Sequence, residues 1–227
     1  QQMCAFLDQQ IADLRASFAS GAPAPQTVIG RLVHMQNDPS THLADDQIRS
    51  QLIGSITGTV DTTARAVLGT FQTLFEMPEQ LAAAQKAAAA NDDATLMAII
   101  WEAMRFHPQN TIIPRLCVSA YTVAHGTDRA ITIQPGTLVM AANFSAMFDR
   151  IELDAPEEFR PNRPSSNYIH FGYAQHRCLG EYIAQVQLRE TVKRVLLLKG
   201  LHKVTSPDDP KVAYGNLPTA MSVTFEA

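Results

Sequence analysis

The sequence predicts a mainly α-helical protein with small β-sheets, and three observations support this. Apolar residues recur at helical spacing through most of residues 4–106. Two later segments, 112–123 and 130–141, are rich in Val, Ile and Thr and are typical of short strands. A further helical pattern with an apolar stripe runs over residues 179–198. Because 46% of the 227 residues are hydrophobic, these elements can bury a sizeable core.

Five helices are expected before the strands, and turn-forming residues separate them. Glycine and prolines within residues 20–26 end the first helix. Asp45 stands at an N-cap-like position before the third helix, which is the longest. Pro78 opens the fourth, whose many alanines favour a helix, and Pro108 stops the fifth. The expected spans are 4–18, 29–35, 46–75, 78–90 and 95–106.

Irregular segments are expected to connect the remaining elements. Turn signals at residues 126–127 and 135–136 divide the strand-forming region. Residues 149–166 are polar and contain several prolines, which favours a meandering loop. The tail, residues 201–227, is expected to form a last hairpin around residues 216–218.

Composition and charge argue against several classes of protein. A net charge of −4 does not suit a nucleic-acid binder that depends on an overall positive field. The sequence has neither an apolar run long enough for a transmembrane helix nor a recognisable signal peptide. Cys4, Cys117 and Cys178 are irregularly spaced, unlike a disulfide framework or a zinc site. We therefore expect a soluble, cytoplasmic protein in a reducing compartment.

The strongest chemical signal is a glycine-containing loop that leads into Cys178 at the start of the last helical pattern. Backbone N–H groups and the dipole at a helix N-terminus favour a thiolate there. A thiolate is an axial ligand of haem iron that favours O–O cleavage, and Phe171 can shield such a sulfur from water. A free cysteine is more often a core residue, so the spacing of its neighbours has to distinguish the two interpretations.

That spacing favours a ligand. Residues 171–180 resemble the cysteine-loop signature of the cytochrome P-450 family, Phe-x-x-Gly-x-x-x-Cys-x-Gly. Phe171, Cys178 and Gly180 match this signature, and Gly172 and His176 also stand where the family commonly has these residues. Ala174 stands where the family usually has glycine, and alanine is less favourable there if its φ is positive. The resemblance implies haem b as cofactor, held by these residues, with Cys178 as the ligand to the iron.

A second pattern of the family precedes the loop. Glu102 and Arg105 resemble its Glu-x-x-Arg pair, and at i and i+3 of a helix the two side chains share a face. An isolated pair of this kind would be a surface ion pair of little energetic weight. The resemblance implies instead a buried structural triad, completed by Arg163 from the meandering loop.

Residues 58–63 of the longest helix resemble the oxygen-activation segment of the family. An acid beside an alcohol can relay protons in a general-acid step, and the resemblance gives these catalytic roles to Asp61 and Thr62. An ordinary polar helix face is the alternative, although Thr and Asp compete for backbone hydrogen bonds in helix interiors. Thr59 departs from the family, which usually has glycine there.

The resemblance also implies ligand-binding residues. Arg115 and His176 are candidates for binding the haem propionates, and the guanidinium of Arg115 suits carboxylate recognition; for each residue a surface charge or a capping group is the alternative. Ile112, Ile113 and Leu217 resemble substrate-facing positions, with ordinary core positions as the alternative.

The implied function is monooxygenation of a small apolar organic substrate, with O2 and electrons from a ferredoxin or flavin reductase. Basic residues of the last helical region are candidates for docking that donor, and a solvated helix face is the alternative: Arg177, Arg189, Lys193 and Arg194. A hydroperoxide isomerase or peroxygenase within a fusion protein is a second hypothesis. A non-catalytic haem-binding module or an inactive fragment is a third.

The resemblance covers nearly the whole chain, although typical family members are roughly twice as long. The chain also begins with Gln1 rather than Met. We therefore expect residues 1–227 to form a single haem-thiolate domain with the C-terminal portion only of the P-450 fold, truncated at its N-terminus.

Overall fold

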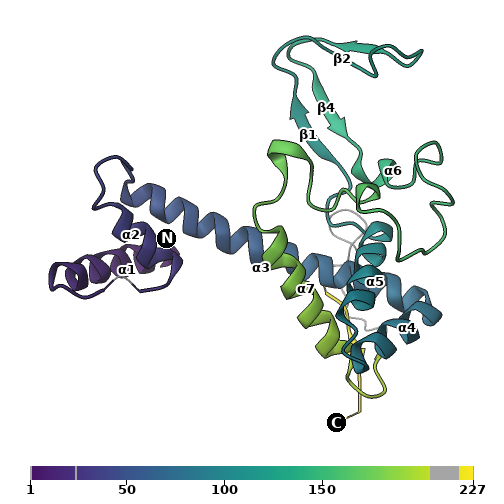
Figure 1. The fold of residues 1–227 in the computed structure, drawn as a ribbon, viewed down its shortest axis with the longest axis horizontal. Helices are drawn as coiled ribbons and strands as arrows, with labels where there is room; N and C mark the ends of the chain where they lie inside the picture. Colours follow the sequence, from purple (N-terminus) through teal and green to yellow (C-terminus); the bar gives the residue numbers. More distant parts are fainter. Residues whose placement is uncertain (1, 24, 205–219, 227) are drawn as a thin grey trace. The chain divides into compact units, whose positions relative to one another are not determined.

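The computed structural model describes residues 2–23, 25–204 and 220–226 (Figure 1). The chain divides into two compact units, residues 1–62 and 63–227, and helix α3 (Asp45–Glu76) contributes to both. Among the described residues the strands form three two-stranded sheets, and helices dominate the rest. The predicted class, mainly α with small β-sheets, is confirmed.

The first unit contains α1 (Gln2–Ala19), α2 (Val28–Met35) and the first part of α3. Ile11, Val33 and Ile48, one from each helix, form its buried core. The hydroxyl of Thr27 caps α2 by accepting a hydrogen bond from the N–H of Gly30 at 3.2 Å. These helices agree with the predicted ones to within a few residues at each end.

Asp45 plays a different part from the predicted N-cap, because it is already the first residue of α3. Its carboxylate accepts hydrogen bonds from Arg15 at 2.9 Å and from Gln36 at 2.8 Å. Asp45 therefore ties α1 and the end of α2 to α3, while its charge still favours the positive end of the helix dipole.

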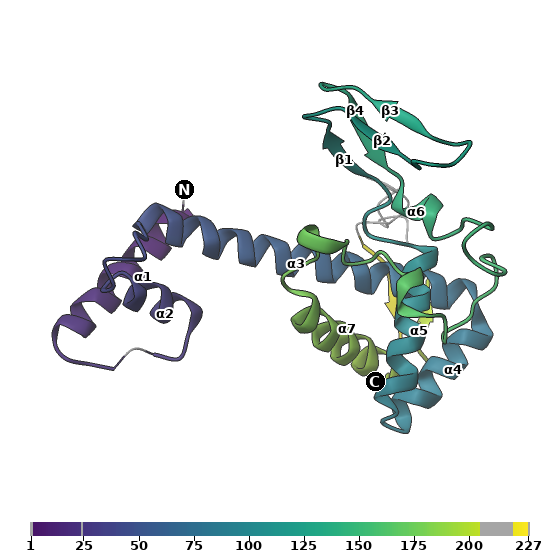
Figure 2. The same cartoon turned by 45° about the horizontal axis from the view of Figure 1, so that its top comes forward.

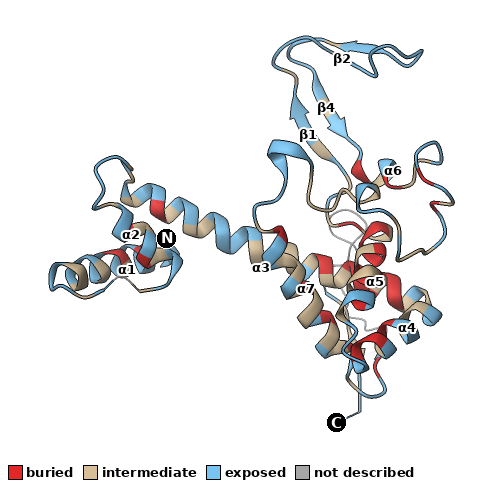
Figure 3. Ribbon diagram, in the orientation of Figure 1, coloured by how far each residue is buried: buried red, intermediate tan, exposed pale blue. Residues whose placement is uncertain are grey.

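Helices form the core of the second unit. The packed helices are α4 (Pro78–Ala89), α5 (Asp93–Phe106), α7 (Glu181–Leu196) and the second part of α3. Leu74, Ile100 and Val192 are all fully buried, and Figure 3 shows such residues concentrated in these helices. Asp92 caps α5 by accepting a hydrogen bond from the N–H of Thr95 at 3.1 Å.

Four short strands follow α5 and stand apart from those helices (Figures 1 and 2). The antiparallel pairs are β1 (Ile113–Leu116) with β4 (Leu138–Ala141), and β2 (Tyr121–Val123) with β3 (Ile131–Ile133). Arg115 lies opposite Val139, and Thr122 lies opposite Thr132 with their hydroxyls 2.8 Å apart. Both predicted strand-forming segments are confirmed, each divided by a loop.

A last antiparallel pair joins β5 (His202–Lys203) to β6 (Val223–Thr224). This pairing agrees with the predicted C-terminal hairpin, whose expected turn at residues 216–218 lies outside the described residues. Within the part of the chain that the structure describes, no helix is both long and apolar enough to cross a membrane.

The segment between β4 and α7 is mostly irregular, as predicted. One helical turn that the sequence did not predict, α6 (Asn143–Ala146), opens it. Short 3-10 turns span Ser165–Asn167 and Ala174–His176. α7 begins at Glu181, two residues later than the expected start at residue 179, so Cys178 lies in the loop just before the helix.

Candidate haem-thiolate site

A tight loop holds Cys178 directly before α7. The N–H of Cys178 donates to the carbonyl of Phe171 at 2.7 Å, and this hydrogen bond closes the loop. Gly172 has a φ of +74°, and a Cβ there would lie only 2.7 Å from the carbonyl oxygen of His176. Glycine is therefore required at this position, both for its conformation and for the close approach of the backbone.

Ala174 lies in the middle of the same loop with a φ of +48°. Its carbonyl accepts a hydrogen bond from the N–H of Arg177 at 3.0 Å, which closes the 3-10 turn. A left-handed conformation costs an L-residue roughly 1–2 kcal/mol. The loop thus contains one strained residue, at the position where the P-450 signature usually has glycine.

The surroundings of Cys178 suit a flat, apolar ligand. Cys178 is exposed, and the apolar side chains of Leu179 and Tyr173 are 99% and 83% exposed. An ideal Cβ on Gly180 would lie 3.8 Å from the Cys178 sulfur, so glycine leaves room beside it. An exposed thiolate can bind haem iron, and exposed apolar side chains in the same loop can contact the apolar ring of the haem. The residues present therefore fit a haem held through Cys178.

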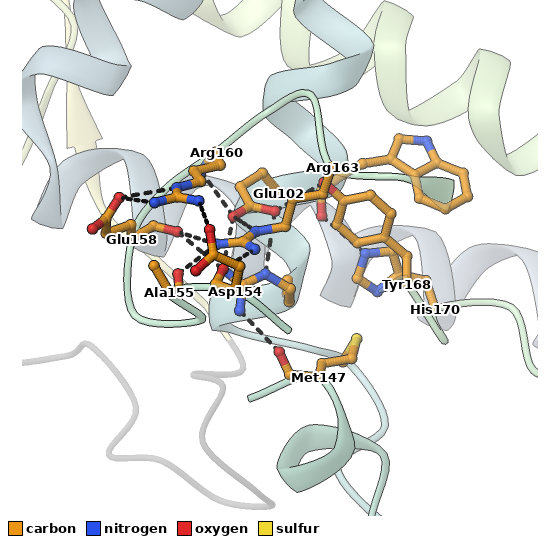
Figure 4. A network of polar contacts seen from close by, with 11 residues as sticks. Glu102, Met147, Asp154, Ala155, Glu158, Arg160, Arg163, Tyr168 and His170 are labelled. Carbon is orange, nitrogen blue, oxygen red and sulfur yellow. Dashed lines mark hydrogen bonds and ion pairs between the residues drawn. The ribbon is translucent and has the colours of Figure 1, made fainter. Parts of the chain in front are cut away.

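A buried network of polar contacts surrounds Glu102 (Figure 4). Glu102 and Arg105 are fully buried, and Nη2 of Arg105 donates to Oε1 of Glu102 at 2.7 Å. Nε of Arg163 donates to the same oxygen at 3.1 Å, and its side chain is only 5% exposed. The structure thus brings together the three residues of the expected triad.

The two arginines of this network also hold the irregular segment that follows β4. Their guanidinium groups donate to backbone carbonyls that have no place in a helix or sheet. The accepting carbonyls belong to Met147, Asp154, Ala155 and Glu158, at 2.6–3.2 Å. The triad therefore fixes the loop as well as neutralising Glu102.

Glu102 is held in its ionised form although it is buried. Burial by itself raises the pKa of a carboxyl group. The hydrogen bonds from Arg105, from the N–H of Arg160 and from the Tyr168 hydroxyl act in the opposite direction, and the pKa of Glu102 lies below its ordinary value. Hydrogen-bond donors to both carboxylate oxygens thus stabilise the buried negative charge of Glu102.

Sequence reasoning missed Trp101, Tyr168 and His170. The Tyr168 hydroxyl donates to Oε2 of Glu102 at 2.9 Å, and burial together with the Glu102 charge raises the pKa of Tyr168. Nε2 of His170 lies 2.9 Å from the carbonyl oxygen of Trp101, and burial lowers the pKa of His170 to about 4. The available signal was the presence of three aromatic residues within four positions, Tyr168, His170 and Phe171, at the entry to the loop.

The expected catalytic pair lies on α3. The Thr62 hydroxyl donates to the backbone carbonyl of Gly58, one helical turn earlier, and Asp61 is exposed. Both residues belong to the first unit, whereas Cys178 belongs to the second. Their catalytic role toward the cysteine side of the site therefore stays a prediction.

The expected propionate and substrate residues lie outside the Glu102 network. Arg115 and His176 are exposed, and within the described residues no carboxylate pairs with Arg115. Ile112 is 48% exposed and Ile113 is partly buried at the start of β1. Leu217 lies outside the described residues.

Most of the candidate residues for electron-donor docking are already paired. Arg189 and Lys193 both pair with Asp93, at 3.5 and 2.8 Å, and Arg177 pairs with the first residue of α7 at 2.5 Å. Arg194 is exposed. These local pairs favour a solvated helix face over a concentrated basic patch.

Comparison with known protein families identifies the family to which this chain belongs. The family model for cytochrome P-450 matches residues 1–198, which is most of the chain. The chain belongs to the cytochrome P-450 family. Membership implies a thiolate-ligated haem, in agreement with the exposed Cys178 and the loop that holds it.

Individual P-450 relatives and structures show how much of the family fold is present. Linoleate diol synthase from Gaeumannomyces graminis is 35% identical over 79 residues, which are 35% of this chain and 7% of that protein. A putative cytochrome P-450 137 from Mycobacterium tuberculosis is 30% identical over 191 residues, 80% of this chain and 38% of the relative. The crystal structure of CalO2 superimposes with a TM-score of 0.80 at 19% identity, covering 99% of this chain and 53% of that one.

The chain thus spans less than half the length of these curated relatives and about half of the CalO2 chain. The prediction of a P-450 fold in part of its full extent is confirmed.

Replacing Glu102 by glutamine tests the buried network. The two guanidinium groups would keep their charges without a buried counter-ion, so we expect the free energy of unfolding to fall by about 3 kcal/mol. Glu190→Gln is the matched control, because Glu190 pairs with Arg189 at the surface and is 43% exposed; its change should stay below about 1 kcal/mol. Urea unfolding measures both, and equal losses would contradict the assigned role of Glu102.

Ala174→Gly tests the strained position of the cysteine loop. Glycine relieves the left-handed strain, so we expect the free energy of unfolding to rise by up to about 1 kcal/mol. The same change at Ala184, inside α7, should lower it by about 1 kcal/mol because glycine is a poor helix former. Opposite shifts of the two urea midpoints are the predicted result, and a loss of stability in both variants would refute it.

Proposed function

We propose that this chain provides the haem-binding part of a haem-thiolate monooxygenase that oxidises a small apolar organic substrate. The observation that supports this most is the loop in which the Cys178 N–H bonds to the Phe171 carbonyl and the thiol remains exposed. The reaction inserts one atom of O2 into the substrate and reduces the other to water, with electrons from a ferredoxin or flavin reductase.

In this proposal, haem b bound through sulfur supplies the oxygen activation, which an electron-donating thiolate promotes. Cys178 would provide that thiolate, and Phe171, whose ring is partly buried, would shield the sulfur from water once the haem is bound. Arg115 and His176 would bind the carboxylates of the haem, because both are exposed cationic or donor groups. Gly172 and Gly180 leave the backbone and the sulfur the room that this arrangement needs.

Proton transfer in this proposal belongs to Asp61 and Thr62. The Thr62 hydroxyl hydrogen is held on the carbonyl of Gly58. With haem bound in the full protein, Asp61 and the Thr62 hydroxyl would act as the acid and the alcohol of a proton relay, the general-acid role proposed for them. Ile112 and Ile113 would contact the substrate, whose apolar character matches these side chains.

Exchange of Cys178 for serine tests the proposed ligand. In the reduced, carbon-monoxide-treated protein reconstituted with haem, we expect the long-wavelength Soret band for which the family is named. Cys178→Ser should abolish this band because it removes the thiolate. Cys117→Ser is the matched control: Cys117 is partly buried and its thiol donates to the carbonyl of Ser119 at 2.9 Å, so the band should persist. A folded, haem-loaded wild-type protein without the band would exclude thiolate ligation.

A second candidate function is a peroxide-dependent reaction within a longer oxygenase. The similarity to linoleate diol synthase supports it, because the 79 matching residues are only 7% of that much longer protein. A hydroperoxide isomerase or peroxygenase takes its oxygen from a peroxide and needs no reductase.

Turnover measured with a fatty-acid hydroperoxide and, separately, with O2 plus a reductase distinguishes the two candidates. The monooxygenase proposal predicts product only with the reductase and incorporation of labelled oxygen from O2. Product from the hydroperoxide alone would favour the second candidate, and haem binding without turnover in either assay would indicate a non-catalytic module.

A further inference from the structure

One indole ring packs against three aromatic residues of the segment that enters the cysteine loop. The ring centroid of Trp101 lies 5.4, 5.3 and 5.6 Å from those of Tyr168, His170 and Phe171. The interplanar angles of 54–67° are in the tilted and edge-on range that aromatic pairs prefer. α5 therefore contacts the loop through an aromatic cluster in addition to the Glu102 network.

His170 adds a directional hydrogen bond to this cluster. Its Nε2 lies 2.9 Å from the backbone carbonyl oxygen of Trp101. A carbonyl can only accept, so Nε2 carries the hydrogen and the neutral ring has a fixed tautomer. The ring of Tyr168 stacks on the imidazole at 5.3 Å with an interplanar angle of 27°, which restrains its orientation. Figure 4 shows Tyr168 and His170 side by side.

The hydrogen bond between His170 and the Trp101 carbonyl can affect the cysteine loop because of where both residues lie in the chain. Trp101 directly precedes Glu102, and His170 directly precedes Phe171. The carbonyl of Phe171 accepts the hydrogen bond from the Cys178 N–H at 2.7 Å. The buried Glu102 carboxylate is thus connected to Cys178 by the backbone of α5, the imidazole of His170 and the hydrogen bond at the base of the loop.

We infer that His170 is a positioning residue, whose hydrogen bond to the Trp101 carbonyl fixes Phe171 and thereby the place of the Cys178 sulfur. The inference rests on the proposed function, in which Cys178 binds the haem iron. The neighbouring groups have separate roles. The Glu102 network anchors the segment that precedes the loop, and the Trp101 ring packs beside that segment. His170 fixes the position of the segment along α5.

Variants at His170 separate the hydrogen bond from the packing. His170→Phe keeps a flat ring in the cluster but removes the N–H donor. His170→Gln restores a donor, because the glutamine amide nitrogen is separated from Cα by the same number of bonds as Nε2 of histidine. His125→Phe is the matched control, since His125 is exposed in the loop between β2 and β3.

The first measurement is amide hydrogen exchange over residues 171–178 in the full 227-residue chain without haem. We expect the Cys178 amide to exchange roughly three- to tenfold faster in His170→Phe, as for the loss of one hydrogen bond. His170→Gln and His125→Phe should stay near the wild-type rate. Unchanged exchange in α4 shows that the helical core is intact.

The second measurement is the carbon-monoxide difference spectrum after haem loading. His170→Phe should lower the fraction of protein with the long-wavelength Soret band, and His170→Gln should restore it. A wild-type exchange rate in His170→Phe, or no recovery in His170→Gln, overturns the inference. Should His170→Phe not fold, Asn and Gln give the same comparison, because the shorter asparagine amide does not reach the carbonyl.

The two proposals fail in different ways. If the wild-type protein lacks the long-wavelength band but His170→Phe still speeds loop exchange, thiolate ligation is wrong and the positioning role of His170 is supported. If the band is present and responds to Cys178→Ser but not to His170→Phe, the proposed function stands and the role of His170 is refuted.

Discussion

The fold of the second unit depends on the ion pairs and hydrogen bonds made by one buried, ionised carboxylate, that of Glu102. Removing a carboxylate and two guanidinium groups from water costs several kcal/mol per ion, and this is recovered only if every polar atom finds a partner. Here both carboxylate oxygens accept more than one hydrogen bond. The Arg105 guanidinium lies in addition 4.7 and 4.5 Å from the ring centroids of Phe106 and Phe148, which favours its charge.

The network organises a stretch of chain that secondary structure does not. Between α6 and α7 the backbone has little regular hydrogen bonding, so its carbonyls need donors from side chains. Arg105 and Arg163 provide them, and each arginine thus connects the ion pair to the path of the loop. A bidentate, rigid guanidinium suits this double task better than an ammonium group would. The cysteine loop follows directly, so its geometry depends on contacts made more than ten residues earlier.

The sequence predicted contacts between residues that are close in the chain, and it did not predict contacts between residues that are far apart in the chain. Helical periodicity predicted α1 to α5 and α7 because one face of each helix is buried, and the spacing of Glu102 and Arg105 predicted that they share a face. α6 was missed because four residues are too few for a periodic pattern. The contacts of Tyr168 and His170 with α5 join residues more than 60 positions apart, and no spacing rule relates them.

Asp45 illustrates the same limit on a smaller scale. An acidic residue before a helix favours an N-cap, but the side chain instead reaches Arg15 and Gln36. Tertiary partners therefore took precedence over the local capping preference. The family resemblance extended the prediction beyond local rules, because it related Arg163 to Glu102 across 61 positions, where the structure has a hydrogen bond of 3.1 Å.

Gly172 and Ala174, two residues apart in the cysteine loop, show where the rigidity of the loop originates. Gly172 is required by the close approach of the His176 carbonyl, whereas Ala174 adopts a left-handed conformation with only its own strain to oppose it. Such strain persists only when several surrounding contacts together fix the backbone conformation. The loop is fixed at its base by the Phe171–Cys178 hydrogen bond, the Trp101 ring and His170. A loop held in this way tolerates alanine at position 174, whereas the close approach of the backbone at position 172 still requires glycine.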